Sequence, residues 1–334
     1  MTPILDRPVF VVGVPRSGTT VMSTLLSSSP TICIAPEIWF FNYWMQKYDF
    51  LDLSDRNSYT FFVDQFLASK RFRYLELDAQ PIRDQLINSD VQSFQSVFST
   101  VLTHYADKFA KSRVGEKTPG QFQSIEKIIE LYPDAKIVCM VRDPYAVAAS
   151  TINSEFGSNH VLDSAIRWKR YSRILSERSH ENCICIVRYE DLVLQFEREI
   201  PRVATFLDIE LDPAIAKTSR DGNYAVGDRG EGWAKDHFQK AFNALNPQSI
   251  DKWKTHLSLE QKRVIRCQIA DEMSHWGYAA HEDEGPQCES TARKAMRRWK
   301  SKMKALSRPS LLLSKSRTYN RLTYRLFGKV MERN

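Results

Sequence analysis

A short apolar run near the start of the chain leads through a glycine turn into a helical pattern. The run Pro8–Val14 is rich in β-branched residues and short enough to be a buried strand. A helix is expected from Gly18 to about Ser28, because Val21, Leu25 and Ser28 share one face. A buried strand followed at once by a helix is the first half of an α/β unit, so this junction favours folds built on a parallel sheet.

The same alternation continues along the chain. Further strands are expected at 32–35, 136–141 and 184–188, and helices at 121–132, from Pro144 onward, at 196–207 and at 258–275. Residues 39–113 have a mostly helical pattern, and residues 217–247 indicate a long loop. The predicted fold class is α/β, with a P-loop-like central parallel β-sheet flanked by helices on both faces.

The charge of the chain is concentrated at its end. The 334 residues carry a net charge of +7, but residues 291–334 hold 14 Lys or Arg and one acid, Glu332, which leaves the rest at −6. A nucleic-acid groove in the main domain is therefore not expected, and no nucleic-acid partner is predicted. The predicted organisation is a main domain at 1–280, a linker at 281–291 and a basic amphipathic helical tail at 292–334.

The tail has an amphipathic pattern. Met296, Trp299, Met303 and Leu306 recur at helical steps, with Lys and Arg on the other face. Such a helix suits an anionic membrane surface, the protein's own core, or a second subunit in a homodimer, and the sequence leaves the three open.

Other features bear on the location of the protein. The sequence has no apolar run long enough to span a membrane and no signal-peptide pattern. Its six cysteines form no disulfide-like framework. A cytoplasmic location is predicted, with the cytoplasmic face of a membrane as the peripheral site.

The first strand–helix junction is suited to binding an anion. Gly13-Val-Pro-Arg-Ser-Gly-Thr-Thr20 presents consecutive backbone N–H groups and a helix N-terminus. The spacing of its glycines matches a P-loop, but Thr19 takes the place of the Walker lysine, and the cation comes earlier, at Arg16. A phosphate-like group is expected on a set of adjacent residues: Arg16, Ser17, Gly18, Thr19 and Thr20.

A second anion-binding element is predicted where another strand ends. Arg142 follows the strand 136–141, and Ser150 lies eight residues later on the next helix. An arginine fork with a hydroxyl is a suitable clamp for a second phosphate. The alternative is that Arg142 simply forms an ion pair with Asp143. Together, the two elements predict a ligand with two separated phosphate-like groups.

At this point the sequence resembles the sulfotransferases that use 3′-phosphoadenosine 5′-phosphosulfate (PAPS). Residues 15–20 match the family's 5′-phosphosulfate loop, and Arg142 with Ser150 matches its 3′-phosphate motif. The segment 187–193 contains Tyr189 at the position of a nucleotide-contacting tyrosine, and 250–254 resembles a late segment whose lysine, here Lys252, closes over the nucleotide. The resemblance covers about residues 8–278 and implies PAPS as donor and the 3′,5′-bisphosphate PAP as product.

The resemblance also suggests a catalytic base. The protein-tyrosine and several bacterial branches use a glutamate after the first helix, and Glu37 matches that position. Its apolar neighbours Ile38 and Trp39 predict a raised pKa for its carboxyl group. Glu116 is the alternative base. Two histidines are set aside: His104 lies in a helical stretch, and His256 comes after the 3′ motif.

The segment 115–119 resembles the one that brings a lysine to the transferring group. Lys117 would stabilise charge on the leaving oxygen, and with Glu37 and Arg16 it completes the predicted catalytic set; a plain surface ion pair of Lys117 with Glu116 is the alternative. No metal site is predicted. The predicted reaction is in-line sulfuryl transfer to a hydroxyl of a carbohydrate, lipid or small molecule, favoured over a protein tyrosine. A P-loop nucleotide kinase and a non-catalytic bisphosphate-binding membrane adaptor remain as alternatives.

Overall fold

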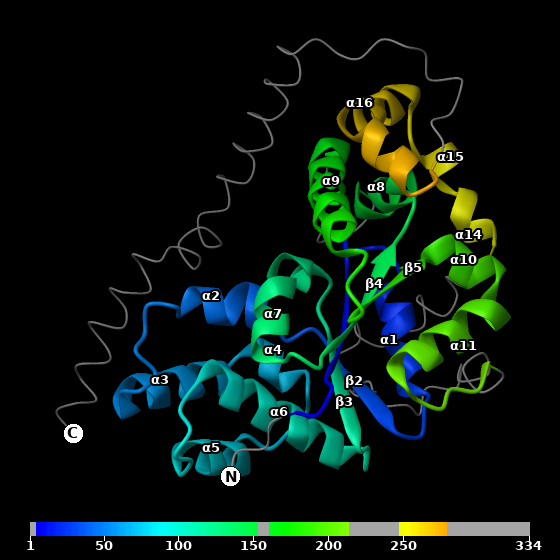
Figure 1. The fold of residues 1–334 in the computed structure, drawn as a ribbon. Coiled ribbons are helices and arrows are strands. Elements are labelled where there is room, and N and C mark those ends of the chain that lie inside the picture. Colours follow the sequence, from blue (N-terminus) through cyan, green and yellow to red (C-terminus); the bar gives the residue numbers. More distant parts are fainter. Residues whose placement is uncertain (1–4, 153–159, 214–246, 279–334) are drawn as a thin grey trace.

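The computed structural model describes residues 5–152, 160–213 and 247–278, which are arranged around a five-stranded parallel sheet (Figure 1). The strands are β1 (Val9–Gly13), β2 (Ile32–Ala35), β3 (Arg113–Lys117), β4 (Lys136–Val141) and β5 (Ile184–Arg188), in the order β2-β3-β1-β4-β5. All four pairings are parallel, as predicted. The predicted linker and tail, and the predicted loop except for residue 247, lie outside the described residues.

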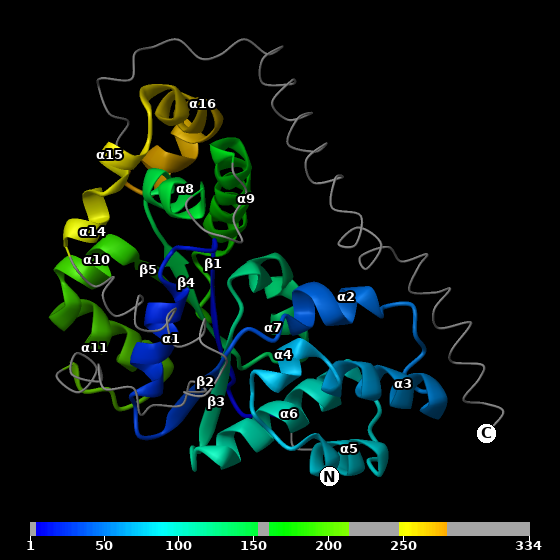
Figure 2. The ribbon, with the colours of Figure 1, turned by 180° about the vertical axis from the view of Figure 1, so that it is seen from behind.

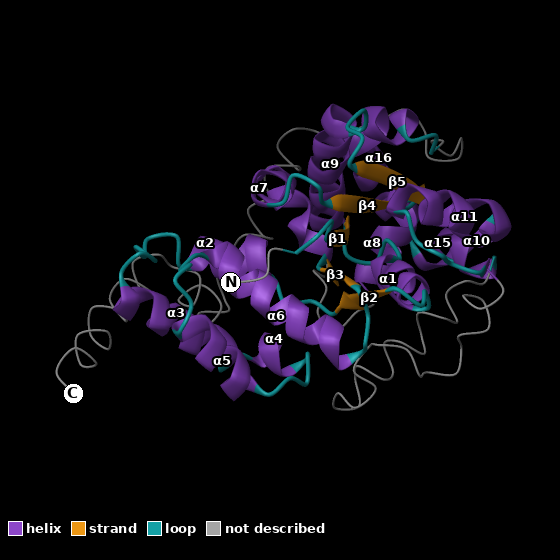
Figure 3. Cartoon of the chain, turned by 60° about the horizontal axis from the view of Figure 1, so that its bottom comes forward, coloured by secondary structure: helices purple, strands orange, loops and turns teal. Residues whose placement is uncertain are grey.

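Helices occupy most of the remaining described chain, as Figure 3 shows by colour. They are α1 (Thr19–Ser27), α2 (Met45–Lys47), α3 (Arg56–Leu67), α4 (Lys70–Arg73), α5 (Ala79–Ile87), α6 (Phe94–Lys108), α7 (Ile125–Leu131), α8 (Pro144–Ile152), α9 (Val161–Arg178), α10 (Tyr189–Leu194), α11 (Phe196–Leu207), α14 (Gln248–Asp251), α15 (Trp253–His256) and α16 (Leu259–His275). A π-helix, η1 (Phe40–Trp44), precedes α2, and a 3-10 helix, η2 (Pro119–Ser124), precedes α7. None of the described helices is long and apolar enough to cross a membrane.

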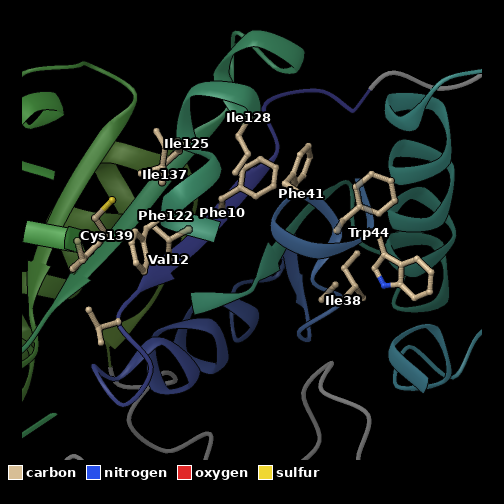
Figure 4. Close-up of a cluster of buried hydrophobic side chains, with 14 of the residues drawn as sticks. Phe10, Val12, Ile38, Phe41, Trp44, Phe122, Ile125, Ile128, Ile137 and Cys139 are labelled. Atoms are coloured by element: carbon tan, nitrogen blue, oxygen red, sulfur yellow. The ribbon is translucent and has the colours of Figure 1, made fainter. Parts of the chain in front are cut away.

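Both faces of the sheet are covered by helices. Along β1, Val9 and Val11 face a core shared with α1, α10 and α11, whereas Phe10 and Val12 face a larger core that includes α6, α7, α8 and α9. Figure 2 shows the first group of helices from behind, and Figure 4 shows Phe10 and Val12 in the second core. Burial on both faces explains why β1 reads as a continuous apolar run rather than an alternating one.

One strand is absent from the sequence prediction. Residues 39–113 were expected to be mostly helical, and most of them are, but β3 begins at Arg113 and runs to Lys117 between β1 and β2. Its charged residues Arg113, Glu116 and Lys117 are all buried. Because three of its five side chains are charged, β3 lacks the apolar run that identifies the other strands.

Candidate functional site

The carboxyl ends of the parallel strands bring most of the predicted residues to one edge of the sheet. The loop 14–18 follows β1, Glu37 follows β2, and Lys117 ends β3. Arg142 follows β4 and Tyr189 follows β5. Ligands of open α/β sheets bind outside this edge, so the fold collects these side chains where a ligand is expected.

The loop 14–18 is a tight turn held by backbone geometry. The Ser17 N–H donates to the carbonyl oxygen of Val14 at 3.0 Å, and both Arg16 (φ 78°) and Gly18 (φ 89°) are left-handed. A Cβ on Gly18 would lie 2.5 Å from Cδ2 of Tyr189, so a larger residue does not fit there. Gly18 caps α1 without a side-chain hydrogen bond, and Thr19 and Thr20 form the first helical turn. The first-turn N–H groups therefore suit an anion.

The two predicted anion-binding elements meet directly. Nε of Arg16 donates to Oγ of Ser150 at 2.9 Å, and Nη1 of Arg142 donates to the carbonyl oxygen of Arg16 at 3.0 Å. Arg142 forms no ion pair with Asp143, whose carboxylate instead accepts N–H groups at the start of α8. The ion-pair alternative for Arg142 is therefore wrong, and this arginine instead contacts the loop 14–18 and Ser249.

Tyr189 and the segment α14 complete this part of the site. The guanidinium carbon of Arg142 lies 4.1 Å from the centre of the Tyr189 ring. The Tyr189 hydroxyl contacts Oγ of Ser249 at 3.2 Å, and Nη2 of Arg142 donates to the Ser249 carbonyl oxygen at 3.4 Å. Sequence reasoning missed Ser249, although it lies within three residues of Lys252. Lys252 itself is exposed at the junction of α14 and α15.

Two buried polar atoms in these elements have no protein partner among the described residues: Oγ of Ser17 and Nε of Arg142. Buried polar atoms are almost always hydrogen-bonded, so such atoms beside a tight backbone turn fit a ligand with acceptor oxygens. The two atoms belong to the two separate elements. The arrangement therefore fits a molecule with two anionic groups.

The predicted catalytic pair is formed by residues 80 positions apart. Nζ of Lys117 lies 2.8 Å from Oε1 of Glu37, and the Lys117 side chain is 7% exposed, against 31% for Glu37. The indole N–H of Trp39 donates to the other carboxylate oxygen at 3.1 Å. Glu37 also acts electrostatically on Arg16, which connects this pair to the anion-binding loop. The alternative ion pair of Lys117 with Glu116 is wrong, since the partner is Glu37.

The predicted direction of the Glu37 pKa is also wrong. Burial raises the pKa of this carboxyl group, as expected from its apolar neighbours. The charge of Lys117 and its hydrogen bond, the hydrogen bond from Trp39 and the charge of Arg71 lower it by more, so the net pKa lies below the ordinary value. Glu37 is therefore ionised at neutral pH and able to accept a proton.

Glu116 has the opposite environment. Its side chain is fully buried in β3, and burial raises the pKa of its carboxyl group to about 8. Oε1 accepts hydrogen bonds from the backbone N–H of Ile38 and the hydroxyl of Thr118. At neutral pH the protonated acid is the favoured form, so Glu116 is a poor candidate for a base that meets a substrate.

The two set-aside histidines lie outside the predicted catalytic set. His104 is half-buried in α6 and hydrogen-bonded to the Gln85 side chain, and His256 is exposed at the end of α15. Within the described ranges, no group of three or more His, Cys, Asp or Glu residues is arranged to hold a metal ion.

Comparisons with known proteins point to one family. A family model described as "Sulfotransferase family" matches residues 8–213. Protein-tyrosine sulfotransferase 1 of Danio rerio is 24% identical over 297 residues, covering 83% of this chain and 74% of the relative. Nodulation protein NoeE of Sinorhizobium fredii is 25% identical over 304 residues, covering 80% and 65%.

A solved structure shows the same fold. The sulfotransferase domain of the Synechococcus PCC 7002 olefin synthase superimposes with a TM-score of 0.55 at 19% identity, covering 84% of this chain and 98% of that domain.

Proposed function

Because this chain belongs to the sulfotransferase family, we propose that it transfers the sulfuryl group of PAPS to a hydroxyl group of an acceptor. The observation that supports this most directly is the hydrogen bond between Arg16 and Ser150, which joins two anion-binding elements at one sheet edge. PAPS carries two anionic groups that could occupy these two elements, a 5′-phosphosulfate and a 3′-phosphate. The ion pair of Glu37 and Lys117 lies at neighbouring strand ends, where the transferring group would need it.

Each element has its own part in holding the donor. The loop N–H groups and Arg16 would bind the 5′-phosphosulfate, with Ser17, Thr19 and Thr20 lining the turn. Arg142 and Ser150 would bind the 3′-phosphate. The Tyr189 ring, which closes over Gly18, supplies a wall beside the nucleotide, and Lys252 on the exposed side supplies a further cation.

The chemical step needs a base and a cation. Glu37, ionised and partly exposed, would accept the proton of the acceptor hydroxyl as its oxygen attacks sulfur and the bond from sulfur to the bridging phosphate oxygen breaks. The electron pair of that bond leaves with the 3′,5′-bisphosphate. Lys117 and Arg16 would stabilise the charge that develops on the leaving oxygen.

We propose a hydroxyl of a carbohydrate, lipid or small molecule as the acceptor, in preference to a protein tyrosine. Trp39 is half-buried and bonded to Glu37, and the half-buried Tyr43 packs against Trp39 with the ring centres 6.3 Å apart. Arg71 stacks on one face of Trp39, and the aromatic surface that remains suits a ring-shaped acceptor, a sugar as well as a phenol. Transfer of labelled sulfate from PAPS to panels of glycans, lipids, phenols and tyrosine peptides identifies the class, and labelling of the peptides alone would contradict this preference.

The donor is tested by calorimetric titration with 3′,5′-bisphosphate and with ATP. Tight binding of the bisphosphate and weak binding of ATP are expected, because Thr19 occupies the place of the Walker lysine. Tighter binding of ATP would favour the nucleotide kinase. Bisphosphate binding without turnover on any acceptor class would favour the non-catalytic adaptor.

The base is tested with Glu37→Gln. This variant keeps the size of the side chain, so bisphosphate affinity should stay near the wild-type value while kcat falls by roughly 10²–10⁴. Near-normal turnover of Glu37→Gln would remove Glu37 from the role and return Glu116 to it.

A further inference from the structure

Trp39 has a backbone conformation that is unusual for its side chain. Its φ of 57° and ψ of 35° place it in the left-handed region, which bulky residues rarely adopt. The residue lies between Glu37 and the π-helix η1, and its carbonyl oxygen accepts the N–H groups of Tyr43 and Trp44. Strained residues persist only where the surrounding structure holds them, so the contacts of Trp39 bear on the function of the site.

Two buried side chains, Glu116 of β3 and Thr118 just after it, hold the backbone at residues 38 and 39. Glu116 accepts the N–H of Ile38 at 3.1 Å, and the hydroxyl of Thr118 accepts the N–H of Trp39 at 3.2 Å. The Thr118 hydroxyl in turn donates a hydrogen bond to Oε1 of Glu116. Both anchoring side chains are almost fully buried, at 0% and 1% exposure. Two consecutive N–H groups are thus fixed by one buried unit, the Glu116–Thr118 pair.

The indole ring is held from its other side by an arginine. The guanidinium carbon of Arg71 lies 3.6 Å from the centre of the Trp39 ring, and its Nη1 approaches the Glu37 carbonyl oxygen at 3.5 Å. A cation stacked on an indole face restrains the ring. The indole N–H then points at the Glu37 carboxylate, opposite the contact from Lys117.

We propose that Trp39 is a positioning residue for Glu37, and that the Glu116–Thr118 pair maintains the left-handed backbone that aims its indole N–H at the carboxylate. This inference rests on the proposed role of Glu37 as the base. It assigns Glu116 a function away from the substrate, in place of the alternative role as base.

The test is the pH dependence of kcat in Trp39→Phe. The variant keeps an aromatic ring but loses the hydrogen bond to ionised Glu37, so the pKa of Glu37 rises. The midpoint of the acidic limb of the kcat–pH profile should therefore move to higher pH, by roughly one unit. Three cations, Lys117, Arg71 and Arg16, and the buried Glu116 remain around the carboxylate and are unchanged by the substitution. Glu37 stays ionised at neutral pH in the variant, so the fall in kcat expected there, roughly 5- to 20-fold, comes from the lost orientation of the carboxylate and not from its protonation. Bisphosphate affinity should be unchanged.

The matched control is Trp276→Phe. Trp276 also donates an indole hydrogen bond, but to Ser172 of α9 at 2.6 Å, from its place at the C-terminal end of α16. Loss of this hydrogen bond should leave both kcat and the acidic limb of its pH profile at their wild-type values.

A second pair of variants tests the anchor. Thr118→Val preserves shape but removes the acceptor for the Trp39 N–H, so the acidic limb should move upward as in Trp39→Phe. Thr118→Ser retains the hydroxyl and should keep the wild-type kcat–pH profile. The contrast between the two variants separates a hydrogen-bonding role of Thr118 from a role in packing.

The outcomes separate this inference from the proposed function. An unmoved limb in both Trp39→Phe and Thr118→Val, with Glu37→Gln inactive, would overturn the positioning role and leave the base assignment intact. A fall in bisphosphate affinity and melting temperature with no movement of the limb would also overturn it, because the role would be structural. Normal turnover of Glu37→Gln would overturn the base assignment and this inference together.

Discussion

Single side chains in this protein take their properties from partners that are distant in the sequence. The prediction for the pKa of Glu37 treated its neighbours at 38 and 39 only as a source of burial, although the indole of Trp39 also donates a hydrogen bond that lowers this pKa. Lys117 reverses the net direction, and nothing near Glu37 in the sequence indicates that contact. Residue types and their place on the sheet edge can thus be predicted from sequence, whereas the sign of a pKa shift requires the fold.

Arg142→Ala should weaken binding of 3′,5′-bisphosphate far more than binding of a 5′-monophosphate. One charge-assisted contact is worth about 1.5–3 kcal/mol, which corresponds to roughly 10- to 150-fold in affinity. Titration of both ligands measures the difference. Arg173→Ala on α9 is the matched control, since Arg173 forms an ion pair with Glu272 of α16 and belongs to neither predicted anion-binding element. Equal losses for the two ligands would show that Arg142 does not bind the 3′ group.

Glu116→Gln should change how stability depends on pH. The folded pKa of Glu116 is about 8, against an ordinary 4.5, so the folded state holds a proton that the unfolded state releases over this range. The contribution of Glu116 to the free energy of unfolding of the wild type therefore falls as pH rises from 4.5 toward 8, by at most about 1.4 kcal/mol per unit.

The glutamine variant lacks this titration. Its stability relative to the wild type should rise between pH 5 and 8, whatever constant cost the amide adds, as measured by denaturant unfolding at a series of pH values. Parallel curves for the two proteins would contradict the buried, protonated carboxyl group.

At the scale of elements, the apolar strands are predictable and the charged one is not. The ranges of β2, β4 and β5 agree with the sequence prediction, because each is an apolar run. β3 is hidden because Arg113 and Lys117 have partners that compensate their burial: Arg113 donates to the carbonyl oxygens of Arg7 and Leu207, and Lys117 pairs with Glu37. The periodicity of the sequence does not show such long-range compensation, and the predicted catalytic Lys117 lies on this strand.

An aromatic contact holds the segment α14–α15 against α8, in addition to the contacts of Ser249 with Tyr189 and Arg142. Trp253 is 3% exposed and stacks on Tyr145 of α8 with ring centres 4.7 Å apart. Trp253→Ala should loosen the segment and with it the contact of Ser249 with Arg142. Hydrogen exchange at 248–256 should become faster, and bisphosphate affinity should fall roughly ten-fold.

Leu259→Ala is the control for this element. Leu259 is 53% exposed at the start of α16, so its removal should change neither exchange in α14–α15 nor affinity. Faster exchange in Trp253→Ala with unchanged affinity would show that the segment is not part of the binding site.

At the scale of the whole molecule, the separation of charge suggests a peripheral membrane attachment. Residues 291–334 carry +13 and the rest of the chain −6. We propose that the tail binds anionic lipid, since each basic residue near such a surface contributes about 1 kcal/mol within a Debye length of about 8 Å.

Truncation after Cys288 should abolish co-sedimentation with anionic liposomes at low salt and preserve bisphosphate binding, because every predicted donor-binding residue precedes position 253. Neutral liposomes serve as the control. Unfolding of the truncated protein would assign the tail to the core, and failure of the full chain to sediment would also contradict the membrane proposal.

The strand order has a consequence for synthesis of the chain. β1 is made first but lies at the centre of the sheet, where Val9 pairs with Gly115 on one side and Lys136 on the other. Arg142 then meets Ser249 only after a further 107 residues, which at roughly 5–20 residues per second is several seconds or more of translation. A nascent chain can thus complete its sheet before Ser249 of α14 reaches the predicted donor site. We therefore expect a nascent chain to begin binding the nucleotide when α14 has left the ribosome, and not already when the sheet has folded.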